Sequence, residues 1–129
     1  MTAFAGLKVL VVEDEGSIAL LIESMLEDLG CEIVVSAGHL TEAREAAAMA
    51  GLNLAVLDVN IDGQPVFPIA DILRHRRIPF IFSTGYGEQG LPASLKGHLV
   101  LSKPFTLADL KRTISAALDP SHNPGPSQV

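Results

Sequence analysis

Short apolar runs alternate with segments of helical periodicity along most of the chain. Five runs are short and nearly all apolar, as expected of strands that helices cover on both faces; they span residues 7–12, 31–35, 54–57, 79–83 and 99–101. The second run is shorter and more polar than the first, which places it nearer an edge of the sheet. The alternation predicts βα units around a parallel sheet.

Between these runs, apolar residues recur at the spacing of one helix face. The pattern predicts helices over about 18–29, 40–50 and 66–74, and a last helix that opens after Thr106 as N-cap. Gly30 and Gly51 follow the first two helices as stop signals, and Pro68 fits the third only in its first turn. Segment 88–97 is weak as a helix because Gly90 and Pro92 interrupt it. Right-handed connections between such units give an α/β fold with a doubly wound five-stranded parallel sheet.

Composition fits one globular domain. The chain has 129 residues, of which 48% are hydrophobic and 19% charged. We predict a domain over residues 1–119 and a disordered tail over 120–129, which is rich in Pro, Gly and Ser. The single cysteine, Cys31, excludes an intramolecular disulfide.

The net charge and the length of the apolar runs limit the classes of partner and the cellular location to expect. A net charge of −6 argues against nucleic-acid binding, which needs clustered basic residues. The basic group Arg74-His75-Arg76-Arg77 is interpreted as the solvated end of a helix. The alternative is that it contacts a partner protein. No apolar run approaches the roughly 20 residues of a membrane helix, and the N-terminal run is too short for a signal peptide. We expect a cytoplasmic protein.

Charged and hydroxyl residues stand where four predicted strands end. Glu13-Asp14 follow the first strand, Asp58 the third, Ser83-Thr84 end the fourth, and Ser102-Lys103-Pro104 follow the fifth. In doubly wound sheets, ligands bind beyond the carboxyl ends of the strands. Each feature has a plain alternative: acidic residues stabilise helix N-termini, and a threonine can bond its own turn. Their joint placement at four strand ends favours a shared site.

Such a group of residues suits phosphoryl transfer. Three carboxylates close together repel one another unless a divalent cation joins them, and oxygen-only ligands favour Mg²⁺. A lysine and a threonine hydroxyl can then contact phosphoryl oxygens, and a carboxylate can act as the nucleophile.

The same residues resemble the response-regulator receiver domain of two-component systems, over about 6–119. The resemblance implies a flavodoxin-like (βα)5 sheet of order 2-1-3-4-5. It further implies phosphorylation of Asp58, Mg²⁺ bound directly by Asp14 and through water by Glu13, and a metal ligand in the backbone carbonyl of Asn60. Thr84 and Lys103 would contact the phosphoryl group. A sensor histidine kinase or phosphotransfer protein would be the donor, and an unknown protein the downstream partner. We expect a monomer or weak dimer and no enzyme in its own right.

The chain departs from the family pattern at two places. Loop 58–63 is shorter than the usual Pro- and Gly-bearing loop, and Val100 stands where an aromatic switch residue is usual. Segment 79–87 instead resembles a receiver subgroup with F-A-T-G-Y-G after the fourth strand, which appears in stand-alone receivers. Tyr86 is either a replacement for the missing aromatic or a surface loop residue.

Two other function classes are compatible with an α/β chain of this size. A haloacid dehalogenase-type phosphatase would carry its nucleophile after the first strand, together with a cap. A flavodoxin-like nucleotide or flavin binder would carry a phosphate loop there, whereas Glu13-Asp14-Glu15 would repel phosphate. Both classes fit less well than a receiver.

Overall fold

The computed structural model describes residues 4–85 and 99–120. A parallel sheet of five strands runs through it in the order β2-β1-β3-β6-β7. Its strands are β1 (Lys8–Val12), β2 (Glu32–Ala37), β3 (Leu54–Asp58), β6 (Phe80–Thr84) and β7 (Val100–Ser102). This confirms the predicted order 2-1-3-4-5 and the place of β2 at an edge.

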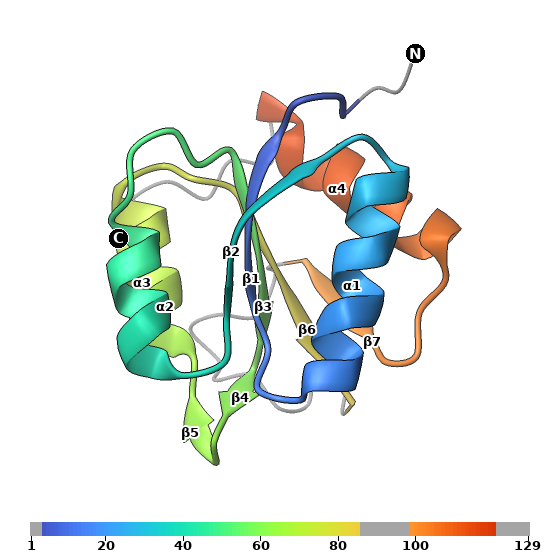
Figure 1. The fold of residues 1–129 in the computed structure, drawn as a ribbon. Helices are drawn as coiled ribbons and strands as arrows, with labels where there is room; N and C mark the ends of the chain where they lie inside the picture. Colours follow the sequence, from blue (N-terminus) through green and yellow to red (C-terminus); the bar gives the residue numbers. More distant parts are fainter. Residues whose placement is uncertain (1–3, 86–98, 121–129) are drawn as a thin grey trace.

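Helices cover both faces of the sheet (Figure 1). The elements α1 (Gly16–Asp28) and α4 (Leu107–Leu118) lie on one face, and α2 (Leu40–Ala47) and α3 (Phe67–His75) lie on the other. Because neighbouring residues of a strand point to opposite faces, each strand contributes side chains to two hydrophobic cores, one on each face of the sheet. Leu10 and Phe82 pack towards α2 and α3, and Val11 and Ile81 pack towards α1 and α4. All four of these side chains are fully buried.

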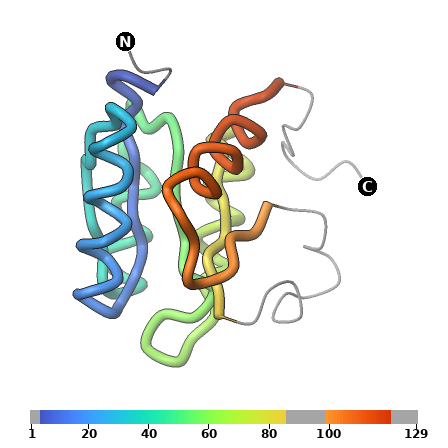
Figure 2. Tube along the Cα trace, turned by 90° about the vertical axis from the view of Figure 1, so that its right-hand side faces the viewer, coloured from blue at the N-terminus to red at the C-terminus, as the bar shows by residue number. Residues whose placement is uncertain are grey.

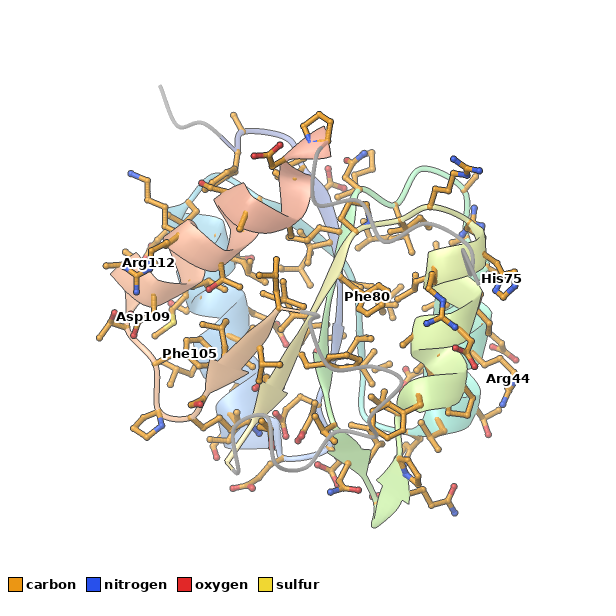
Figure 3. The ribbon with its side chains drawn as sticks, turned by 180° about the vertical axis from the view of Figure 1, so that it is seen from behind. Arg44, His75, Phe80, Phe105, Asp109 and Arg112 are labelled. Atoms are coloured by element: carbon orange, nitrogen blue, oxygen red, sulfur yellow. The ribbon has the colours of Figure 1, made fainter. Side chains whose placement is uncertain are left out.

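Local chemistry explains where several helices begin. Pro68 lies in the first turn of α3, the position that the sequence pattern allowed. Thr106 caps α4 as predicted: its hydroxyl accepts from the Asp109 amide, and the Asp109 carboxylate accepts from the Thr106 amide. The bond from the Thr106 amide to the carboxylate lowers the pKa of Asp109, and the Thr106 hydroxyl and Arg112 beside it act in the same direction (Figure 3).

The second helix is shorter than predicted. The pattern indicated a helix to about Ala50, whereas α2 ends at Ala47. The Arg76 guanidinium Nη1 donates to the carbonyls of Ala47 at 2.6 Å and Met49 at 3.0 Å. Arg76 thus takes up carbonyls that a further helical turn would have used, which stabilises an early stop. The basic group 74–77 is therefore more than a solvated helix end.

A small hairpin between β3 and α3 was not predicted. It consists of β4 (Asn60–Ile61) and β5 (Gln64–Pro65), which pair antiparallel. Its two turn residues, Asp62 and Gly63, have φ of 53° and 77°. Two consecutive left-handed residues make a type I′ turn, for which Asp-Gly is a preferred sequence. In Figure 2 the hairpin projects from the end of the sheet where β1 meets α1.

Two further expectations bear on the ends and the environment of the chain. Within the described residues, no helix is long and apolar enough to cross a membrane. The proposed tail falls almost wholly on residues 121–129, and the weak helix 88–97 and Tyr86 likewise lie outside the described residues. Those expectations stay predictions.

Candidate functional site

The strand ends named by the sequence converge at one edge of the sheet. Hydrogen bonds of the parallel ladder continue into the loops and fix this edge: the Glu13 amide donates to the Ala37 carbonyl at 3.0 Å, and the Lys103 amide to the Thr84 carbonyl at 2.9 Å. Asp58 lies beside Ser83 in the register of β3 and β6. The backbone pairing of the strands therefore brings Glu13, Asp58 and Lys103 to the same edge of the sheet, independently of side-chain contacts.

Three carboxylates form a cluster at this edge. Glu13, Asp14 and Asp58 each offer an oxygen within 4.8 Å of the others. Glu13 is buried, Asp58 is half-buried, and Asp14 is exposed. The cluster thus runs from the interior to the surface, with its outer side accessible to an ion or a phosphoryl donor.

Lys103 lies between two of the carboxylates. Its ammonium Nζ is 2.9 Å from Glu13 Oε1 and 3.1 Å from Asp58 Oδ2. The side chains of Glu13 and Asp58 are only 1% and 13% exposed, so these ion pairs are weakly screened by water. Lys103 precedes Pro104, and the peptide bond between them is cis.

Burial and charge act against each other in this pair. Burial raises the pKa of Glu13 by disfavouring its charged form, and the bond from Lys103 only partly reverses this. Burial alone would lower the pKa of Lys103, but its bonds to Glu13 and Asp58 outweigh that effect and raise it. The lysine is therefore held in its charged form by two acidic neighbours.

Backbone amides hold the other carboxylate oxygens. The Glu15 amide donates to Glu13 Oε2 at 3.2 Å, and the Asn60 amide donates to Asp58 Oδ1 at 3.3 Å. The Asp62 amide donates to Asp14 Oδ2 at 2.7 Å. Each carboxylate is thus oriented by the loop that follows a strand, two of them by their own loop and Asp14 by the hairpin.

The remaining predicted residues lie near this cluster with different degrees of support. Thr84 is buried at the end of β6, one residue beyond the neighbour of Asp58 in the sheet. Asn60 is exposed, and its amide faces the Asp58 carboxylate, to which it donates. Val100 pairs with Phe82 and packs against the α2–α3 side of the core, so the position of the usual aromatic is filled by an aliphatic core contact.

Two residues near the site were missed by the sequence reasoning. Asp62 holds Asp14 through its amide, and its carboxylate is paired with His39 Nδ1 at 2.8 Å. The Asp62-Gly63 dipeptide was the available signal, because Asp-Gly between short strands is typical of a hairpin turn. No comparable signal marked His39, since its proximity to Asp62 depends on the packing of two separate loops.

The donor set of the cluster fits a hard divalent cation. All of its donors are oxygens, negative charges outnumber the one ammonium, and Asp14 leaves the outer side open for waters. Mg²⁺ takes one or two carboxylates and keeps several waters, which matches an exposed and a half-buried aspartate side by side.

Comparisons with known proteins agree with this geometry. The family model described as the response regulator receiver domain matches residues 9–115. The regulator PhyR of Methylorubrum extorquens is 30% identical over 122 residues, which cover 92% of this chain and 46% of that protein. The chain thus spans about half the length of that curated relative.

Two solved structures are similar in fold over nearly their whole length. SdrG from Sphingomonas melonis has a TM-score of 0.80 and 34% identity, with 92% of this chain and 99% of that chain covered. The PhyR receiver domain of Erythrobacter litoralis has a TM-score of 0.80 and 31% identity, with 97% and 98% covered. The chain belongs to the family of response regulator receiver domains of two-component systems.

Proposed function

We propose that Asp58 is the phosphoacceptor of this receiver and that Asp14 and Asp58, together with Glu13 and the Asn60 carbonyl, would hold Mg²⁺. The observation that carries the proposal is the double ion pair of Lys103 with Glu13 and Asp58. It sets a fixed positive charge against Asp58, which is the half-buried carboxylate of the cluster and lies beside the exposed Asp14.

These positions support a transfer of the phosphoryl group to Asp58. A carboxylate oxygen of Asp58 attacks the phosphorus of a phosphohistidine, an O–P bond forms, and the P–N bond breaks with its electron pair returning to the imidazole nitrogen. Lys103 neutralises charge on the incoming phosphoryl oxygens, and the Thr84 hydroxyl donates to one of them. Mg²⁺ supplies further charge neutralisation when bound.

A receiver of this kind acts as a phosphoacceptor and not as an enzyme with substrates of its own. A sensor histidine kinase or phosphotransfer protein would supply the phosphoryl group. The phosphorylated chain would then signal through contacts with another protein, pass the group on, or act as a sink. The relative SdrG has also been solved in a BeF3-activated conformation. Beryllofluoride mimics a phosphoryl group, which supports the same chemistry in a relative of this chain.

Intact-mass measurement tests the proposal. The wild-type chain is incubated with acetyl phosphate and Mg²⁺, and its mass should rise by one phosphoryl group. Asp58→Asn should give no adduct, because an amide is a far weaker nucleophile than a carboxylate. Asp28→Asn, a change of the same chemistry at an exposed residue at the end of α1, should behave as wild type. An equal adduct on Asp58→Asn, or none on wild type, would contradict the assignment.

A further inference from the structure

The β4–β5 hairpin has a firm base and a polar tip. Ile61 is fully buried, and the Val66 amide donates to the Val59 carbonyl at 2.8 Å, which closes the loop below the hairpin. The tip residues Asp62 and Gly63 adopt the left-handed conformation that a type I′ turn requires. The position of the tip is therefore set by the fold and by what the tip contacts.

The tip contacts two loops that are distant in sequence. The Asp62 amide donates to Asp14 Oδ2 at 2.7 Å, and Asp62 Oδ2 accepts from His39 Nδ1 at 2.8 Å. His39 is the residue before α2, and Asp14 is the residue after Glu13 in the β1–α1 loop. His39, Asp62 and Asp14 thus form a chain of contacts that ends on an exposed carboxylate of the acidic cluster.

This chain of contacts has more effect on orientation than on stability. The side chains of His39 and Asp62 are 74% and 54% exposed, and ion pairs so exposed add little to the free energy of unfolding. The hydrogen bond from the Asp62 amide, however, fixes one oxygen of Asp14 and so restricts the orientation of this carboxylate. Groups that orient a ligating side chain in this way affect metal affinity strongly.

We propose that Asp62 and His39 are positioning residues for Asp14, which set the Mg²⁺ affinity of the receiver by holding the hairpin tip against this carboxylate. The proposal rests on the proposed Mg²⁺ site. His39 anchors the Asp62 side chain, the anchored turn presents its amide to Asp14, and Asp14 then meets the cation without first losing rotational freedom. Among the described residues, neither His39 nor Asp62 forms a hydrogen bond with the Asp58 carboxylate.

Calorimetric titration with Mg²⁺ alone tests this inference. His39→Ala removes the anchor, and Asp62→Gly removes the carboxylate while keeping the amide and the left-handed conformation of the turn. Each should weaken Mg²⁺ binding about tenfold, the lower end of the range for residues that orient a ligand. The double variant should be no weaker than either single variant, because both changes break the same contact.

Three controls separate positioning from a general effect. His39→Asn keeps a side-chain donor near Nδ1 and should recover most of the affinity. His75→Ala removes an exposed histidine at the end of α3, away from the hairpin, and should leave binding unchanged (Figure 3). The melting temperatures of all variants should match that of wild type.

The possible results are distinct. Wild-type affinity in His39→Ala and Asp62→Gly would overturn the positioning role while leaving the proposed Mg²⁺ site intact. A loss of affinity accompanied by an equal loss in His75→Ala, or by a lowered melting temperature, would also overturn it, since the effect would then be structural. Failure of the wild-type chain to bind Mg²⁺ would overturn the proposed function itself.

Discussion

The two ends of the sheet differ in how their charged groups are paired. At the amino end, several polar groups pair separately: Arg76 donates to the carbonyl of Ala47, the last residue of α2, the Lys8 amide donates to Asn53 Oδ1 at 2.8 Å, and the Lys8 side chain pairs with Glu32. At the carboxyl end, three carboxylates lie together, and one lysine pairs with two of them, Glu13 and Asp58. Like charges this close cost stability in the absence of a cation. The contrast indicates that the amino end stabilises the fold, whereas the carboxyl end holds the candidate binding site.

The first prediction removes the positive charge from the carboxyl end. Lys103→Met should lower the free energy of unfolding by about 2–3 kcal/mol, because it leaves the buried Glu13 without its ionic partner. Mg²⁺ should restore part of the loss, since it replaces a positive charge beside the cluster. Urea unfolding with and without Mg²⁺ measures both effects. Lys111→Met, an exposed change on α4, serves as the control; an equal loss there would contradict the role given to the ion pair.

The second prediction concerns the amino end. Arg76→Ala should lower the free energy of unfolding by about 1 kcal/mol, because two carbonyls at the end of α2 lose a charged donor. Phosphorylation by acetyl phosphate should be unchanged, since the site lies at the other end of the strands. Arg44→Ala, an exposed arginine on α2, should have a smaller effect on stability (Figure 3). A large drop in phosphorylation of Arg76→Ala would erase the distinction between the two ends.

The third and smallest effect has the opposite sign. Asp14→Asn removes one of three like charges and keeps a side-chain oxygen that can accept from the Asp62 amide. Among the described residues, Asp14 forms no ion pair that the substitution would break. It should raise the free energy of unfolding without metal by about 0.5 kcal/mol while weakening Mg²⁺ binding. Thermal unfolding in EDTA and Mg²⁺ titration of the same variant check the pair of effects. A destabilised metal-free variant would show that the cluster carries no repulsive cost.

Much of the fold could be predicted because its signals are local. The apolar run before Asp58 marked β3, and the Thr106 cap marked the start of α4. Right-handed connections predicted a doubly wound sheet, and the resemblance to receiver domains supplied its strand order. The convergence of Glu13, Asp14, Asp58, Thr84 and Lys103 followed in turn, since parallel strands place their carboxyl ends at one edge.

What the sequence missed depends on contacts between distant segments. Strands of two residues, such as β4 and β5, are too short for an alternating pattern to show. The early end of α2 reflects Arg76, which comes from the end of another helix. The Asp62–His39 pair joins two loops that are distant in sequence, so no residue spacing in the chain predicts it. The same limit applies to Lys103, whose pairing with Glu13 adds to the phosphoryl contact that was predicted for it.

A structure of the chain with Mg²⁺ and beryllofluoride would test the assignment of Asp58, Asp14 and Lys103 in a single measurement. We predict beryllium bonded to a carboxylate oxygen of Asp58, Mg²⁺ between Asp58 and Asp14, and the Lys103 ammonium turned towards a fluorine. Beryllofluoride on another residue, or Mg²⁺ bound without a ligand from Asp14 or Asp58, would contradict it.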